Sequence, residues 1–258
     1  MKKSTKITVV SIVGAAVVIM ASVFAYSIIA SQPSPSSPFS YIPGNSSLVL
    51  YVNYNGTKAF LFHWDNESAL LLSSANIKGS NITVPYGNHT FRINMTLYQV
   101  YKGYQIFSFN ISGFIPEVGN YLRNFSYFNS SDRNLTVYSY IPYGSSLVFG
   151  SLSAVEGSIN SYISGKVFSK GNLLNQENNI SFYYSPQNST SHISLAWGGV
   201  NETTAYAYIQ FRNGTSLNLS YIEMLPWIKV KTISSNEIEI SFPLSYISTF
   251  INEEKKIE

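Results

Sequence analysis

Residues 48–64 read LVLYVNYNGTKAFLFHW, two mainly apolar runs that meet at Asn55-Gly56. Branched and aromatic side chains dominate both runs, as is usual in strands. An Asn-Gly pair between two such runs is the strongest short signal for a two-residue hairpin turn. The stretch therefore predicts an antiparallel hairpin with strands over 48–53 and 57–64.

Other strands are predicted where apolar and polar side chains alternate between turn signals. They cover 90–97, 104–111, 205–211, 228–233 and 238–242, with turns at 102–103, 213–214 and 235–236. One face is apolar in each of two of these strands: Phe91, Ile93, Met95 and Leu97, and Ala205, Ala207, Ile209 and Phe211. Such tight turns imply antiparallel pairing.

Helical spacing of apolar residues is confined to three segments. Residues 116–128 begin with Pro116, residues 155–163 carry Val155 and Ile159 on one face, and residues 244–252 follow Pro243. Proline is well tolerated at a first helical turn. The predicted fold class is therefore α+β, predominantly antiparallel β.

The sequence also contains an internal echo. SYIPGNSSLV at 40–49 matches SYIPYGSSLV at 139–148 in eight of ten positions. We interpret the echo as two related β-rich modules, 40–132 and 139–252, which predicts equivalent strands after each copy. A chance similarity between two turn-to-strand entries is the alternative.

An uncharged apolar run covers 7–30 and follows Lys2, Lys3 and Lys6. At about 1.5 Å per helical residue the run is long enough to cross a hydrocarbon core of about 30 Å. The positive-inside rule places residues 1–6 in the cytoplasm and the rest of the chain outside. A cleaved signal peptide, followed by secretion, is the alternative. A Pro/Ser-rich linker covers 31–39, and 253–258 form a charged C-terminal tail.

Fifteen Asn-x-Ser/Thr sequons follow residue 44, whereas 24 Asn and 54 Ser plus Thr would produce roughly five by chance. The enrichment predicts N-glycosylation on an extracellular surface. The acceptors are Asn45, Asn55, Asn66, Asn81, Asn88, Asn94, Asn110, Asn124, Asn129, Asn134, Asn179, Asn188, Asn201, Asn213 and Asn218.

Charge and composition narrow the environment. Beyond residue 6 the chain carries 13 basic and 13 acidic residues, so no long-range field would attract nucleic acid. Charged residues are 11% of the chain and cysteine is absent, although extracellular domains often use disulfides. This composition resembles that of cell-surface proteins of acidophilic, Sulfolobales-type archaea.

A local motif, VPYGNHTF at 84–91, resembles the Pro-x-Gly-x-His-Thr-Val pattern of PEGA-type β-sandwich modules of surface proteins. The resemblance implies that the glycine forms a turn that precedes a strand.

Candidate catalytic residues are scarce. The chain has three histidines, His63, His89 and His192, without metal-site spacing, and two aspartates, Asp65 and Asp132, without a protease motif. Nucleophile-elbow and phosphate-loop motifs are also missing. We therefore predict no enzyme activity, no catalytic or metal residue and no cofactor.

An aromatic group in the second half of the chain has two interpretations. The residues could stack on sugar rings, or they could pack within a sheet, where aromatics are favoured. The group comprises Tyr183, Tyr184, Tyr206, Tyr208, Tyr221 and Trp227.

The resulting hypothesis is a membrane-anchored glycoprotein of the cell envelope with a structural, adhesive or protein-binding role. Its expected partners are the membrane and other envelope proteins, and we do not expect it to bind nucleic acid. The sequence identifies no small-molecule ligand. The first alternative is a receptor-like module for an extracellular sugar or peptide, which a pocket at Trp227 would favour. The second is an extracellular hydrolase, for which Glu223 would converge with Glu202 or Asp65.

Overall fold

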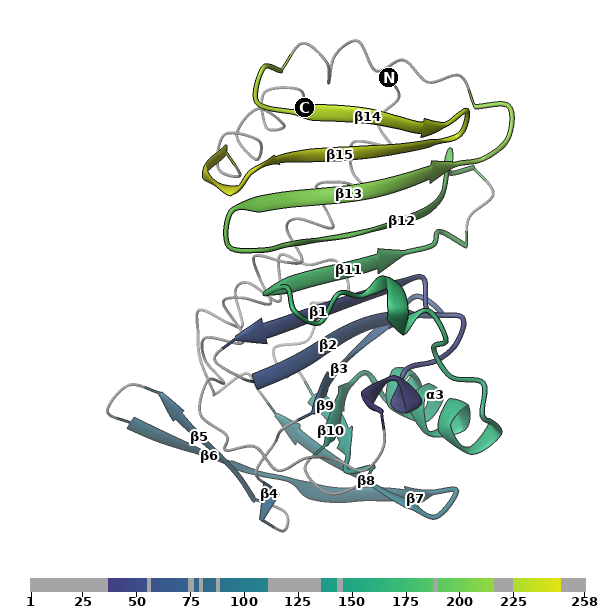
Figure 1. Cartoon of the computed structure of the whole chain (residues 1–258). Helices are drawn as coiled ribbons and strands as arrows, with labels where there is room; N and C mark the ends of the chain where they lie inside the picture. Colours follow the sequence, from purple (N-terminus) through teal and green to yellow (C-terminus); the bar gives the residue numbers. More distant parts are fainter. Residues whose placement is uncertain are drawn as a thin grey trace. The chain divides into compact units, whose positions relative to one another are not determined.

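The computed structural model describes residues 37–54, 57–73, 77–78, 81–86, 89–110, 136–142, 146–187, 190–215 and 225–246. These form fifteen strands, one α-helix and three short 3-10 helices (Figure 1). The 3-10 helices are η1 (Pro38–Tyr41), η2 (Gly171–Leu173) and η3 (Leu244–Tyr246), and the α-helix is α3 (Leu152–Ser164). The strands are β1 (Leu48–Tyr54), β2 (Thr57–Trp64), β3 (Glu67–Leu72), β4 (Ile77–Lys78), β5 (Asn81–Tyr86), β6 (His89–Asn94), β7 (Thr96–Tyr101), β8 (Tyr104–Asn110), β9 (Thr136–Tyr140), β10 (Leu147–Gly150), β11 (Ile180–Tyr184), β12 (Ile193–Val200), β13 (Thr204–Phe211), β14 (Lys229–Ser234) and β15 (Glu237–Pro243).

The fold class is α+β and mostly antiparallel β, as predicted. The predicted strands at 57–64, 104–111, 205–211, 228–233 and 238–242 are observed as β2, β8, β13, β14 and β15, and the helix predicted at 155–163 as α3.

The chain forms two compact units. Among the described residues, one unit holds 37–46 and 52–171 and contains α3; we call it the helix unit. The other holds 47–51 and 172–246, and we call it the sheet unit. These units do not coincide with the two modules expected at 40–132 and 139–252.

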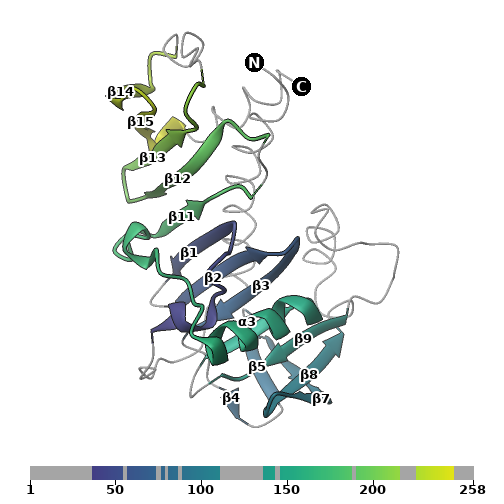
Figure 2. The ribbon, with the colours of Figure 1, turned by 90° about the vertical axis from the view of Figure 1, so that its right-hand side faces the viewer.

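In the helix unit the main sheet has the order β2-β3-β10-β9-β8-β7, and β4, β5 and β6 form a second small sheet. Helix α3 lies across one face of the main sheet and contacts β2, β3, β9, β10 and η1 (Figure 2). Ser151 caps its N-terminus by accepting a hydrogen bond from the Ala154 amide. Gly165 ends the helix with φ 68°, a left-handed conformation that glycine adopts at little cost.

The two copies of Ser-Tyr-Ile-Pro differ in structure but meet at one side chain. Residues 40–41 of the first copy end η1, whereas residues 139–140 of the second end β9. Ser158 of α3 donates a hydrogen bond to the carbonyl oxygen of Tyr41. Its oxygen then accepts from the hydroxyl of Tyr140 at 2.7 Å, because Ser158 has only one proton to donate. The echo therefore marks two segments that pack on the same helix within one unit.

In the sheet unit the strand order is β14-β15-β13-β12-β11-β1. On β13 the apolar residues Ala205, Ala207 and Ile209 pair with Phe242, Ile240 and Ile238 of β15. On the opposite face Tyr206, Tyr208 and Gln210 pair with Ser241, Glu239 and Glu237. The alternation predicted for residues 205–211 is confirmed.

The prediction of a single strand over 90–97 is wrong. β6 ends at Asn94 in the small sheet, and β7 begins at Thr96 in the main sheet. Met95 lies between the two strands, buried, and its sulfur accepts a hydrogen bond from Ser139. An alternating pattern shows which face of a strand is apolar, but it does not show that the strand stays in one sheet.

The turn predicted at 213–214 is present, because the Thr215 amide donates to the Arg212 carbonyl and Gly214 has φ 82°. It does not join neighbouring strands, since β13 pairs with β12 and β15. At the predicted helix over 244–252 the structure describes only η3. The predicted helix at 116–128, the tails, residues 31–36 of the linker and the hairpin turn at 55–56 lie outside the described residues. The end of the predicted linker, Pro38 and Phe39, belongs instead to η1.

Candidate functional site

The sequon asparagines are the predicted site residues that the structure describes best. For five of the fifteen, the structure describes the side-chain environment, and all five are exposed: Asn45, Asn66, Asn179, Asn201 and Asn213. Asn81, Asn94 and Asn110 lie in strands, and the exposure of their side chains is outside what the structure describes. Asn55, Asn88, Asn124, Asn129, Asn134, Asn188 and Asn218 lie outside the described residues.

Asparagines outside sequons behave differently. Of the six that the structure describes, only Asn172 and Asn175 are exposed, whereas Asn53, Asn160, Asn178 and Asn236 are buried or half-buried. The contrast is clearest at two consecutive residues. Asn178, which has no sequon, is 5% exposed and donates to Tyr206 and Ser181, whereas the sequon residue Asn179 is exposed. Exposure in the described part of the chain therefore follows the sequon and not the asparagine alone.

Local backbone chemistry places these acceptors at turns. Asn66 has φ 63° and Asp65 has φ 49° in the two-residue turn between β2 and β3; asparagine and aspartate tolerate this left-handed region. The Asn201 side-chain oxygen accepts from the amides of Thr203 at 2.9 Å and Thr204 at 2.8 Å. Both turns hold the asparagine outside its sheet.

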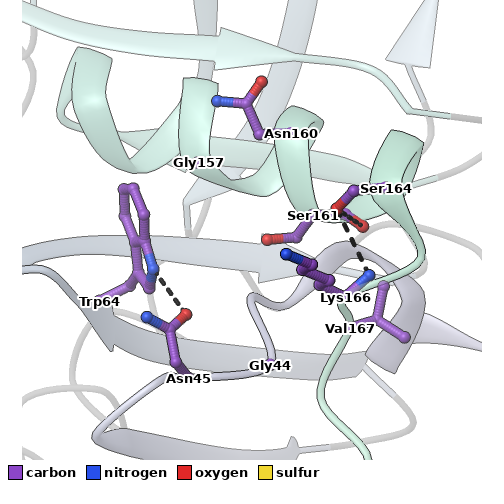
Figure 3. Close-up of a pocket in the computed structure, with 9 residues that line it drawn as sticks. All are labelled: Gly44, Asn45, Trp64, Gly157, Asn160, Ser161, Ser164, Lys166 and Val167. Carbon is purple, nitrogen blue, oxygen red and sulfur yellow. Dashed lines mark hydrogen bonds between the residues drawn. The ribbon is translucent and has the colours of Figure 1, made fainter.

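A groove of about 370 Å³ lies in the helix unit between α3 and the turn at 43–46 (Figure 3). The groove is shallow and open to solvent. Lining it are Gly44, Asn45, Trp64, Gly157, Asn160, Ser161, Ser164, Lys166 and Val167.

Trp64 is held in this groove from two sides. Its indole nitrogen donates to the Asn45 side-chain oxygen at 2.8 Å (Figure 3). Its ring lies against the backbone of Gly157, where an added Cβ would come within 2.4 Å of the ring. The sequon at Asn45 is visible in the sequence, but the pairing with Trp64 is not, because only the fold brings β2 and this turn together.

The proposed sugar-stacking aromatics do not form one surface. Tyr183, Tyr206 and Tyr208 lie on one face of the sheet unit, Tyr184 lies on the other, and Tyr221 lies outside the described residues. Trp197, which the sequence analysis missed, stacks on Tyr208 with ring centroids 5.3 Å apart and an interplanar angle of 16°. Rings that stack on each other cover the faces that a sugar would need, so this geometry favours sheet packing.

Trp227 is also occupied by neighbouring rings. It stacks on Tyr246 at 5.5 Å and contacts Phe242 edge-on at 5.7 Å. The groove described above has no contribution from Trp227.

The candidate titratable groups stay separate. His63 contacts the Ser68 hydroxyl at 3.0 Å; burial lowers its pKa, and nearby Glu67 partly opposes that effect. His192 is exposed, and His89 lies in β6. Within the described ranges no three His, Cys, Asp or Glu side chains lie close enough to hold a metal ion. Asp65 and Glu202 are exposed turn residues, while Asp132 and Glu223 lie outside those ranges.

Strand β7 is an exposed edge that the sequence analysis did not single out. It is the last strand in the order of the helix-unit sheet. Leu97, Tyr98 and Val100 are 51%, 51% and 63% exposed, and residues 96–101 contain no charge and no proline. Natural edge strands usually carry such residues to prevent pairing with other chains. An uncharged run at an edge is the signal that would have identified this strand.

No helix in the described part of the chain combines the length and the apolar character needed to cross a bilayer. The predicted anchor at 7–30 lies outside that part.

No family model matches the chain, and no curated protein is significantly similar to it. The solved structures that are similar to the chain include crystal forms I and III of TP0453, each with 9% sequence identity. The first has a TM-score of 0.46 and covers 86% of this chain and 99% of that chain. The second has a TM-score of 0.41 and covers 81% of this chain and 93% of that chain.

Proposed function

We propose that this protein is an N-glycosylated component of the cell envelope with a structural, adhesive or protein-binding role. In this proposal a single transmembrane helix at 7–30 tethers the chain, with residues 1–6 in the cytoplasm and the two β-rich units outside. The host is an acidophilic archaeon of the Sulfolobales type, as the composition suggests.

The observation that supports the proposal is that the described sequon asparagines are all exposed, whereas most of the other described asparagines are not. Glycan transfer to a folded surface requires an acceptor amide that the transferring enzyme can reach, and a bulky glycan is accommodated only outside the core. All five described acceptors satisfy both requirements, whereas four of the six other described asparagines do not. The structure thus supports the use of these sequons as glycan acceptors.

Strand β7 supports the binding part of the proposal. An exposed edge offers a row of backbone donors and acceptors to an extended segment of another protein, and neighbouring side chains supply specificity. Leu97 and Val100 would supply apolar contacts on one face, because the strand's bulge at Leu97/Gln99 places both opposite Gln99 and Tyr101. Gln99 and Tyr101 are already bonded to Glu156 and Asn160 of α3.

The proposal is tested by glycopeptide mass spectrometry of the full chain from an acidophilic archaeal host. We expect glycans on Asn66, Asn179, Asn201 and Asn213, and none on Asn172, which is exposed but has no sequon. Bare asparagines at all of these sequons would contradict the proposal.

Topology is tested separately on intact cells that express the chain with a C-terminal tag. Added protease should remove the tag and leave a small membrane stub. Full protection of the tag would show that the extracellular assignment of residues 31–258 is wrong.

A further inference from the structure

The groove beside Trp64 has the chemistry of a sugar site. Its lining includes one indole ring, the Ser161 hydroxyl, the Asn160 amide and the Lys166 ammonium group. The Asn160 oxygen already accepts from Tyr101, and the Ser164 hydroxyl already donates to the Ser161 carbonyl. No carboxylate is among the nine lining residues. An aromatic ring packs against the apolar C–H face of a pyranose, and amides, hydroxyls and an ammonium group pair with its hydroxyls. The lining therefore suits a neutral or weakly acidic saccharide.

One lining residue is itself a glycan acceptor. The indole N–H of Trp64 can only donate, so the Asn45 atom that it contacts at 2.8 Å must be the oxygen. This identifies the other amide atom, Nδ2, as the one that would carry the glycan. The hydrogen bond does not compete with glycosylation, because the oxygen stays an acceptor when Nδ2 is bonded to a sugar.

The ring is also pre-organised. Gly157 allows the indole to lie directly on the backbone of α3, and Asn45 holds its nitrogen. A side chain that is fixed before it meets a ligand loses little entropy on contact, so weak contacts contribute more to binding.

We propose that this groove seats the first sugar residues of the glycan on Asn45. This inference rests on the glycosylation proposed above. The covalent link holds the sugar beside Trp64 at a high effective concentration, so the contact does not require the affinity that a free sugar would need. The glycan then covers Trp64 and braces the turn at 43–46 against α3.

The test compares oxidation of Trp64 by hydroxyl radicals in the full chain, measured by mass spectrometry. Ser47→Ala removes the sequon but keeps the Asn45 amide and its bond to Trp64. Ser47→Thr keeps the sequon and is the matched control. Trp197 and Trp227 serve as internal references, because they are the other tryptophans of the chain and neither lines the groove.

We expect Trp64 to be oxidised severalfold more slowly in the glycosylated wild type and in Ser47→Thr than in Ser47→Ala. Oxidation of Trp197 and Trp227 should be equal in all three proteins. If Asn45 is glycosylated and Trp64 is oxidised equally in wild type and Ser47→Ala, the proposed binding of the glycan in the groove is wrong. The glycosylation proposal would then remain intact.

An unglycosylated Asn45 with glycans at other sequons would also contradict only the binding of the glycan in the groove. Absence of glycans from all sequons would contradict both proposals. If Ser47→Ala fails to fold, wild-type molecules with and without a glycan at Asn45 are separated and compared. Equal oxidation of Trp64 in these two fractions contradicts the inference.

Discussion

Gly157 illustrates at the residue scale how one missing side chain positions the candidate groove. An added Cβ would meet three atoms of the Trp64 ring, at 2.4, 2.6 and 2.9 Å. We expect Gly157→Ala to lower the free energy of unfolding, because overpacking costs about 1–3 kcal/mol and alanine's helix propensity recovers only about 1 kcal/mol. Denaturant titration measures the change. Ser153→Ala, at an exposed position of α3, is the control, and a Gly157→Ala protein as stable as that control would contradict the packing.

The lowered pKa of His63 predicts that the stability of the helix unit depends on pH. Burial lowers its pKa below 6.5, with Glu67 opposing the shift, so the unfolded chain takes up the proton first as the pH falls. The contribution of neutral His63 to the free energy of unfolding is therefore complete above pH 6.5. It is lost as the pH falls from 6.5 toward the pKa of His63 in the folded state. We expect His63→Gln to flatten unfolding free energy measured across this interval. His192→Gln, at an exposed histidine, should keep the wild-type slope; equal slopes in both variants would contradict this assignment.

At the scale of elements, β7 is an edge strand with three exposed apolar side chains and no charge. A lysine at Val100, which is 63% exposed, would place a charge on the edge, a common natural protection against pairing. We expect Val100→Lys to slow association of the unglycosylated protein in light-scattering measurements, while stability changes by no more than about 0.5 kcal/mol. Ser153→Lys adds the same charge to α3 and should leave association unchanged. Equal association of the two variants would contradict a role for the edge.

At the scale of the whole molecule, we propose that glycans replace charge as the source of solubility. The chain beyond residue 6 has no net charge, a condition that normally promotes association. We expect combined Asn179→Gln and Asn213→Gln substitutions to increase aggregation at acidic pH in protein from a glycosylating host. Both positions are exposed sequons. Asn172→Gln, exposed and outside a sequon, should have no effect, and unchanged solubility of the double variant would contradict the proposed role of the glycans.

Much of the local structure could be predicted from the sequence. Alternation at 205–211 identified the apolar and polar faces of β13, and the spacing of Val155 and Ile159 identified α3. Each of these signals depends on residues that are neighbours along the chain, so the local pattern already contains the face that must be buried. The exposure of the described sequon asparagines agrees with the sequence-based expectation of an N-glycosylated surface, because a bulky glycan is accommodated only outside the core.

Contacts between distant segments could not be predicted in this way. The pattern at 90–97 is equally compatible with one strand or with two strands in different sheets, and buried Met95 marks where the fold divides it. Identical Ser-Tyr-Ile-Pro segments end a 3-10 helix in the first copy and a strand in the second, because each packs against a different neighbour. Both nevertheless contact Ser158. The pairing of Trp64 with Asn45 likewise depends on the position of α3 at Gly157. Such contacts depend on which faces pack most favourably across the whole unit. Tertiary packing decides them, because its free energy is larger than that of local secondary-structure propensity.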